Sequence, residues 1–151
     1  MSRLPHEGQV TGIYLRPERL AAVVPADSVE ASSAEGLIGD HHSGRYDKRQ
    51  VTLIQHEDLG VVAAFLRLDN LNATRLRRNI VVRGINLIAL KGKRFHIGDA
   101  VFEGTGPCDP CSRMEQELGP GGFNAMRGRG GITARVVKGG WIFISDAVRA
   151  V

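Results

Sequence analysis

Two cysteines, Cys108 and Cys111, are the residues of this chain best suited to chemistry. They are its only cysteines and lie three positions apart in GPCDPCSRM, residues 106–114. The sequence predicts a helix at Cys111, with Asp109 as its cap, Pro110 at its first position, where a missing N–H costs nothing, and Cys111 in its first turn. The first turn of a helix favours negative charge, so Cys111 is predicted to form a thiolate readily. A buried core residue is the structural alternative, and it applies more to Cys108.

A C-x-x-C pair has three common meanings. It can be half of a zinc site, but the chain has no second pair and no histidine spacing that completes one. It can be a thioredoxin-like redox pair, but no βαβ pattern surrounds it. It can also present one working thiolate with a neighbouring thiol, and this meaning fits best. Two thiols cannot hold a four-cysteine iron–sulfur cluster, so none is expected.

Three further clusters carry charge or flexible glycines. The first, residues 36–50, contains Asp40, His41, His42, Arg45, Lys48 and Arg49. The second, residues 74–82 (TRLRRNIVV), is a basic segment that leads into a strand. The third, residues 119–131 (GPGGFNAMRGRGG), has glycines that let its backbone approach a ligand, with Arg127 and Arg129 as speculative anion contacts. Each has a structural alternative: surface histidines, a solvated strand edge and a mobile loop. If strand alternation holds, Arg78 faces away from Arg77 and is left out of the site.

The elements that must position these residues are mainly strands. Apolar, β-branched runs bounded by turn residues predict strands at 9–15, 20–24, 50–54, 79–82, 94–97, 100–104, 132–137 and 141–144. Helices are expected over 57–68, after Cys111 and over 123–128, and a loop over 25–36. FHIGDAV (95–101) and IFISDAV (142–148) each predict a tight turn. The predicted fold is mainly β, a closed or strongly bent barrel with a few short peripheral helices, in one domain spanning 1–151.

The composition of the chain limits the classes of molecule that it is expected to bind. The chain has a net charge of +4, which suits an anionic small molecule, and 5% aromatic residues, too few for the stacking platforms of single-strand nucleic-acid binders. No apolar run approaches the roughly 20 residues of a membrane-spanning helix. The start has no signal-peptide h-region, so a cytoplasmic protein with reduced thiols is expected, with no membrane partner and no nucleic acid.

The ordered motifs resemble the MOSC domain, a family named after the C-terminal domain of molybdenum-cofactor sulfurases. Over roughly residues 9–148 the chain carries, in family order, GLIGDHH, RQVTLI, RRNIVVRGINL, KGKRFHIGDAVFEGTGPCDPC and RGGITARVVKGGWIFISDAV. The resemblance implies a β-barrel core. It also implies a pocket for a pterin-based molybdenum cofactor or a sulfur species.

The resemblance also implies residue roles. Cys111 corresponds to the metal ligand, and Cys108 to an auxiliary thiol. Arg77 and Asn79 correspond to cofactor-binding residues, and Gly39, Asp40 and His42 to residues that line the pocket or fix its loop. A soft thiolate suits molybdenum, and arginine suits the phosphate that the pterin carries.

Three functions remain open from the sequence. The first is an oxotransferase-type reductase of N-hydroxylated compounds that receives electrons from a separate partner. The second is a sulfur carrier or transferase, in which Cys111 takes sulfur as a persulfide from a cysteine desulfurase and Cys108 resolves the product. The third is a non-catalytic module whose basic clusters hold an anion or a partner.

Overall fold

The chain folds around a closed β-barrel. The structure, a computed structural model, describes residues 1, 3–18, 21–41, 47–110 and 112–151. Its strands are β1 (Gly8–Leu15), β2 (Val24–Ala26), β3 (Ser28–Ser32), β4 (Gly36–Leu37), β5 (Val51–Gln55), β6 (Ile80–Arg83), β7 (Arg94–Ile97), β8 (Ala100–Pro107), β9 (Ile132–Lys138), β10 (Gly140–Phe143) and β11 (Ala147–Ala150). Its α-helices are α1 (His56–Phe65), α2 (Ser112–Leu118) and α3 (Gly122–Met126). The 3-10 turns are η1 (Asp47–Arg49), η2 (Ala73–Leu76) and η3 (Leu87–Leu90).

The barrel closes through its first and last strands. Its order is β11-β7-β8-β9-β5-β6-β1, with β2 added beside β1, and the pairing of β11 with β1 completes the ring. Within the ring β5 and β6 are parallel, and the other pairs of neighbouring strands are antiparallel. The predicted mainly-β barrel is therefore confirmed, and closure leaves the ring without a free edge.

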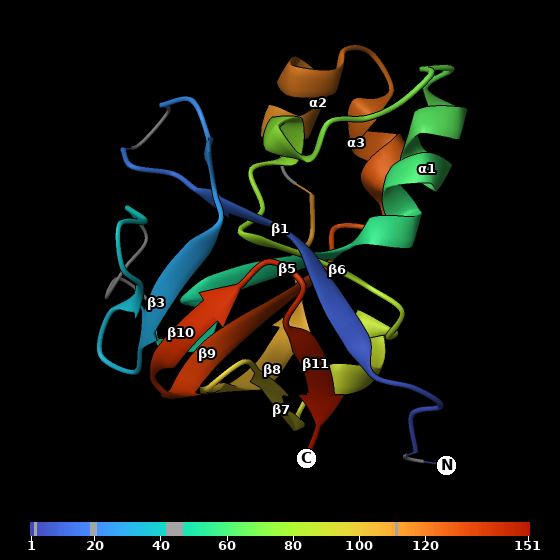
Figure 1. Cartoon of the computed structure of the whole chain (residues 1–151). Coiled ribbons are helices and arrows are strands. Elements are labelled where there is room, and N and C mark those ends of the chain that lie inside the picture. The colour runs from blue at the N-terminus through green and yellow to red at the C-terminus, as the bar shows by residue number, and fades with distance from the viewer. Residues whose placement is uncertain (2, 19–20, 42–46, 111) are drawn as a thin grey trace.

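Two apolar clusters hold the elements together. The larger fills the barrel with fully buried side chains such as Phe95, Phe102 and Leu53. The smaller lies between the barrel and the helices and includes Leu76, Met114 and Met126. The helices α1, α2 and α3 stand together at the end of the barrel away from both chain termini (Figure 1). This helix end also receives the segments that carry the predicted chemistry.

Two predictions near the N-terminus were wrong. The expected strand at 20–24 lies partly outside the described residues, and regular pairing starts only at Val24. The expected loop at 25–36 instead contains β3, which pairs with β10 and β4 in a separate three-stranded sheet. Its residues alternate between buried and exposed, with Val29 and Ala31 in the barrel's apolar cluster. The small polar residues around them conceal this alternation in the sequence.

The helix predictions hold with shorter bounds. The helix expected at 57–68 is α1, which ends at Phe65 because the chain turns at Arg67 with φ of 55°. The helix expected at 123–128 is α3, and α2 follows Cys111. Both predicted turns are present, with positive φ at Gly98 and Ser145. Among the described residues, no helix combines the length and apolarity that crossing a bilayer requires.

Candidate functional site

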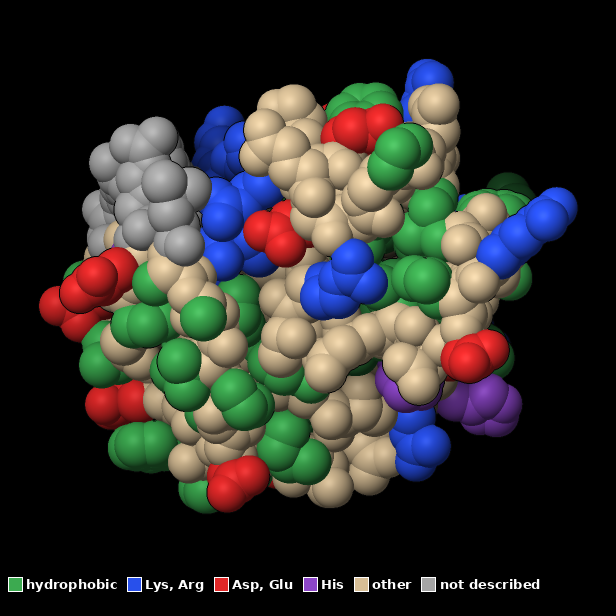
Figure 2. Space-filling view, turned by 90° about the horizontal axis from the view of Figure 1, so that it is seen from above, with side chains coloured by type: hydrophobic (Ala, Val, Ile, Leu, Met, Phe, Trp, Pro, Cys, Tyr) green, Lys and Arg blue, Asp and Glu red, His purple; other side chains and the backbone are tan. Residues whose placement is uncertain are grey.

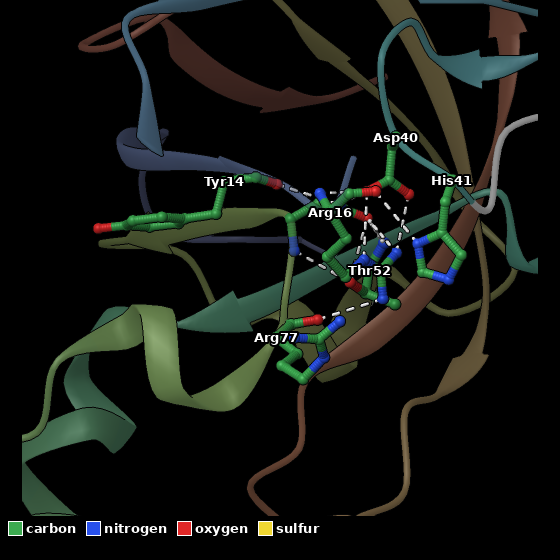
Figure 3. A network of polar contacts seen from close by, with 7 residues as sticks. Tyr14, Arg16, Asp40, His41, Thr52 and Arg77 are labelled. Carbon is green, nitrogen blue, oxygen red and sulfur yellow. Dashed lines mark hydrogen bonds and ion pairs between the residues drawn. The ribbon is translucent and has the colours of Figure 1, made fainter. Parts of the chain in front are cut away.

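Asn79 is the centre of a buried polar network, of which Figure 3 labels Tyr14, Arg16, Asp40 and Thr52. Its side chain is fully buried. Its Oδ1 accepts hydrogen bonds from the Thr52 backbone N–H (3.1 Å), the Thr52 hydroxyl (3.2 Å) and Arg16 Nη2 (3.2 Å). Its Nδ2 donates to the Tyr14 carbonyl (3.1 Å) and to Asp40 Oδ1 (3.2 Å). An amide has two donors and one acceptor oxygen, so the protein itself uses the whole group.

Asp40 and Arg16 form a buried ion pair within this network. Asp40 Oδ1 accepts from the Arg16 backbone N–H (2.8 Å) and from Arg16 Nε (3.1 Å), and Oδ2 accepts from Nη2 (2.9 Å). Burial alone raises the pKa of Asp40, but the hydrogen bonds and charge of Arg16, helped by Asn79, outweigh it and lower the pKa below its usual value. Asp40 is therefore held as a carboxylate.

The loop that carries Asp40 is fixed against the end of β1. Gly39 has φ of 96°, a conformation that favours glycine, and it turns the chain so that Asp40 points inward. The His41 backbone N–H donates to the Arg16 carbonyl at 2.7 Å, and His41 Nδ1 lies 3.1 Å from the same oxygen. His42 lies outside the described residues. Gly39 and Asp40 thus hold this loop against the end of β1, and their predicted role in a ligand pocket stays a prediction.

Arg77 belongs to a second, less buried layer. It ends η2 in the left-handed region, with φ of 57°, and its Nη1 donates to the Ala21 carbonyl at 2.7 Å. Arg16 Nη1 donates to the Arg77 carbonyl at 3.2 Å. Desolvation lowers the pKa of Arg77, and the positive charges of Arg113 and Arg16 lower it further. The guanidinium groups of Arg113 and Arg16 therefore each lie close enough to repel that of Arg77.

Lys and Arg side chains gather on the helix end of the molecule, as Figure 2 shows. In the arginine cluster, which we define as Arg16, Arg77 and Arg113, the nearby acids are Asp40 and Glu117. Asp40 is paired with Arg16, and Glu117 Oε1 lies 3.7 Å from Arg113 Nε. That Nε is buried and has no hydrogen-bond partner. The cluster keeps an excess of positive charge, which favours an anion.

The cysteine turn, residues 106–111, links β8 to α2. Cys108 is 5% exposed, and its backbone N–H donates to the Gly131 carbonyl at 2.8 Å. On either side of Cys108, Pro107 and Asp109 are exposed. Cys111 lies outside the described residues, so the predicted cap by Asp109 and the predicted thiolate remain predictions.

Arg78, which the alternation argument left out, lies beneath this turn. Because β6 starts at Ile80 and Arg77 is in a left-handed conformation, strand alternation does not extend to residues 77 and 78. Arg78 is 7% exposed. Its Nε donates to the Gly130 carbonyl at 2.8 Å and its Nη1 to the Leu76 carbonyl at 3.2 Å.

The two arginines of the glycine-rich segment differ in environment. Arg127 follows α3 and is exposed. The Arg129 guanidinium lies over the Phe65 ring, 5.4 Å from its centroid. It also lines a hollow of about 420 Å³ together with Glu57 and Asp58. The contacts of Arg129 lie away from the arginine cluster, and the role of both arginines as anion contacts stays a prediction.

A protein-family comparison fits this arrangement. The model described as "MOSC domain" matches residues 39–149, which include the Asp40 loop, the Arg77–Asn79 segment and the cysteine turn. The chain belongs to the MOSC domain family. No curated protein matches this MOSC chain.

Solved structures share the fold of this MOSC domain. The YuaD protein from Bacillus subtilis is 19% identical, with a TM-score of 0.85 and 96% of each chain covered. YiiM from Escherichia coli is 16% identical, with a TM-score of 0.75, and the match covers 97% of this chain and 70% of YiiM. YiiM from Geobacillus stearothermophilus is also 16% identical, with a TM-score of 0.75 and coverage of 95% and 75%. At these identities the likeness establishes the barrel and leaves the chemistry open.

The MOSC site includes residues that sequence reasoning missed. Arg16 and Thr52 complete the network around Asn79, and Arg78 and Arg113 contribute buried guanidinium nitrogens without hydrogen-bond partners. One available signal was Arg16 at the end of a predicted strand, directly before Pro17. No local signal marks Arg78, because its burial depends on Gly130, which is distant in sequence.

The donor groups of this site fit an anionic ligand better than a bare metal ion. Among the described residues, no three His, Cys, Asp or Glu side chains are close enough together to bind a metal. The groups without partners are guanidinium nitrogens, which pair with phosphate or other oxyanions. An anionic pterin cofactor whose metal takes one cysteine ligand is compatible with this set.

Proposed function

We propose that this MOSC protein binds a molybdenum cofactor at the helix end of its barrel and uses it to reduce N-hydroxylated compounds. The observation that carries the proposal is the arginine cluster. Its positive charges are close enough to lower the pKa of Arg77, and its nearby acids do not neutralise it. Unpaired positive charge in a desolvated setting is unfavourable, and an anionic ligand relieves it.

The residues divide into ligands and supports. Arg77 and Arg113 are the proposed contacts for the anionic part of the pterin, and Cys111 is the proposed sulfur ligand of the metal. The bound cofactor would supply two-electron oxygen-atom chemistry that no side chain offers. Arg16, Asp40 and Asn79 act as positioning residues, because their polar groups are used within the protein.

The substrate assignment rests on the family resemblance. Reduction of an N–OH group to N–H releases water and consumes two electrons and two protons. We propose that a separate partner supplies the electrons, since two cysteines cannot hold a four-cysteine iron–sulfur cluster.

Metal and pterin analysis of matched cysteine variants tests the proposal. Wild type, Cys111→Ser and Cys108→Ser are purified from a host that makes the cofactor. We expect about one molybdenum per wild-type chain, retention in Cys108→Ser, and loss of at least tenfold in Cys111→Ser, since serine lacks the soft sulfur ligand. Folded wild-type protein without molybdenum would overturn the proposal. If that protein instead gains one sulfur atom on Cys111 from a cysteine desulfurase, it is a sulfur carrier.

A further inference from the structure

Arg78 is a buried cation whose charge has no acidic partner among the described residues. Its guanidinium group donates hydrogen bonds to two neutral carbonyl groups, those of Gly130 and Leu76. Arg78 forms no ion pair with any of the described residues. Its Nη2 is buried and has no hydrogen-bond partner. Burying an unpaired charged donor is strongly unfavourable, so such a group calls for a functional explanation.

The surroundings of Nη2 point toward the cysteine turn. A Cβ on Gly130 would lie 1.9 Å from the Cys108 carbonyl oxygen and 3.3 Å from Arg78 Nη2. The absence of a side chain at Gly130 therefore lets the turn and the guanidinium approach the same point. Pro107 and Asp109 on either side of Cys108 are exposed, so this turn lies at the protein surface.

Arg78 also fixes the turn mechanically. It ties the Leu76 end of η2 to Gly130, and the next residue, Gly131, accepts the backbone N–H of Cys108. The guanidinium thus joins Leu76 to Gly130, and the backbone bond of the adjacent Gly131 connects this pair to the cysteine turn.

We propose that Arg78 is an anion-binding residue behind the cysteine turn, where Nε and Nη1 position the turn and Nη2 receives a compact oxyanion. The proposal deepens the proposed function, on which it rests for the nature of the natural ligand. It adds a contact distinct from the arginine cluster. Inorganic sulfate is the probe, because it presents the same tetrahedral oxyanion chemistry as a phosphate group.

Thermal unfolding of metal-free protein in sodium sulfate and in sodium chloride of equal ionic strength tests this. Arg78→Met is compared with Arg83→Met, a matched control on an exposed arginine that is bonded to Gln9. We expect sulfate to raise the Tm of wild type and Arg83→Met by about 2–4 °C more than that of Arg78→Met, which corresponds to roughly 1 kcal/mol of ligand stabilisation. An equal sulfate effect in wild type and Arg78→Met would overturn the proposal, whatever the basal Tm values.

Two further variants keep the test decisive. If Arg78→Met does not fold, Gly130→Ala serves instead, because its methyl group would displace the turn and the free end of the guanidinium without removing charge. Arg77→Met separates the two sites: loss of the sulfate effect there, with retention in Arg78→Met, assigns the anion to the arginine cluster and contradicts the proposal. Molybdenum retention is measured separately, so either proposal can fail alone.

Discussion

Asn79 uses every hydrogen-bonding group of its side chain inside the protein, and this determines what its replacement does. Asn79→Ala would leave Arg16, Thr52, Asp40 and the Tyr14 carbonyl short of a partner. We expect the free energy of unfolding to fall by about 3 kcal/mol, since several buried polar groups lose bonds at once. Urea denaturation measures this. A variant that keeps its stability yet loses the ligand would show that Asn79 contacts the ligand directly.

Asp40 gives the site a defined pH dependence. Its pKa is lowered in the folded protein, so its contribution to stability is complete above the unfolded value of about 3.9 and is lost as pH falls toward the folded value. Asp40→Asn removes this contribution. Because it leaves Arg16 without its buried counter-ion, we expect about 3 kcal/mol less stability at pH 7.

The measurement for Asp40 is urea unfolding between pH 2 and pH 7, a range chosen around the ordinary value of about 3.9. The difference in stability between wild type and Asp40→Asn should shrink as pH falls below about 4. Other carboxylates cancel in this difference, including Glu57, whose pKa is also lowered. A difference that stays constant with pH would mean that the charges of Arg16 and Asp40 do not contribute to the free energy of unfolding.

At the scale of elements, two glycines have opposite roles. Gly60 lies in the interior of α1, and a Cβ there would meet nothing within 4 Å. Gly104 lies in β8, and a Cβ there would be 2.3 Å from the Leu90 carbonyl oxygen. We expect Gly60→Ala to stabilise the protein by about 0.5–1 kcal/mol, because alanine loses less backbone entropy on folding.

Gly104→Ala is the matched comparison. We expect this variant to lower the free energy of unfolding by about 1–3 kcal/mol, as overpacking does, because η3 has to move away from β8. Thermal denaturation of the two variants checks both signs. Stabilisation by Gly104→Ala would show that the contact between β8 and η3 tolerates an added methyl group.

The sequence revealed elements better than it revealed their junctions. Strands such as β5, β7 and β9 follow from short β-branched runs, and the glycine or serine before Asp marks the turns before β8 and β11. The left-handed conformation of Arg77 has no such signal, since nonglycine residues, and arginine among them, adopt it uncommonly. The prediction that Arg78 faces away from the site assumed strand alternation at residues 77 and 78. The left-handed Arg77 interrupts that alternation, because β6 starts only at Ile80.

The candidate site was predictable by residue type and less so by role. The motif positions Asp40, Arg77 and Asn79 do meet at one end of the barrel. However, Asn79 was expected to contact a ligand, and its hydrogen bonds are instead internal. The residues next to Asn79 in the sequence do not determine whether a distant backbone amide occupies its side-chain acceptor. Here the backbone N–H of Thr52 donates to Asn79 Oδ1.

At the scale of the whole molecule, the barrel separates the two ends of the protein. The helices and the arginine cluster occupy one end, and both termini lie toward the other (Figure 1). The net charge is only +4, so a field that attracts anions depends on where the arginines lie. Surface charges farther apart than about 8–10 Å are largely screened at physiological salt.

Local clustering, rather than net charge, should therefore govern anion binding. Arg113→Gln and Arg149→Gln each lower the net charge by one, but Arg149 is an exposed residue of β11, outside the arginine cluster. We expect Arg113→Gln to weaken inorganic phosphate binding about tenfold and to flatten its dependence on sodium chloride, and Arg149→Gln to change neither by more than about twofold. NMR titration at several salt concentrations measures both quantities. Equal weakening in the two variants would show that phosphate responds to the overall charge and that the helix end has no special affinity for anions.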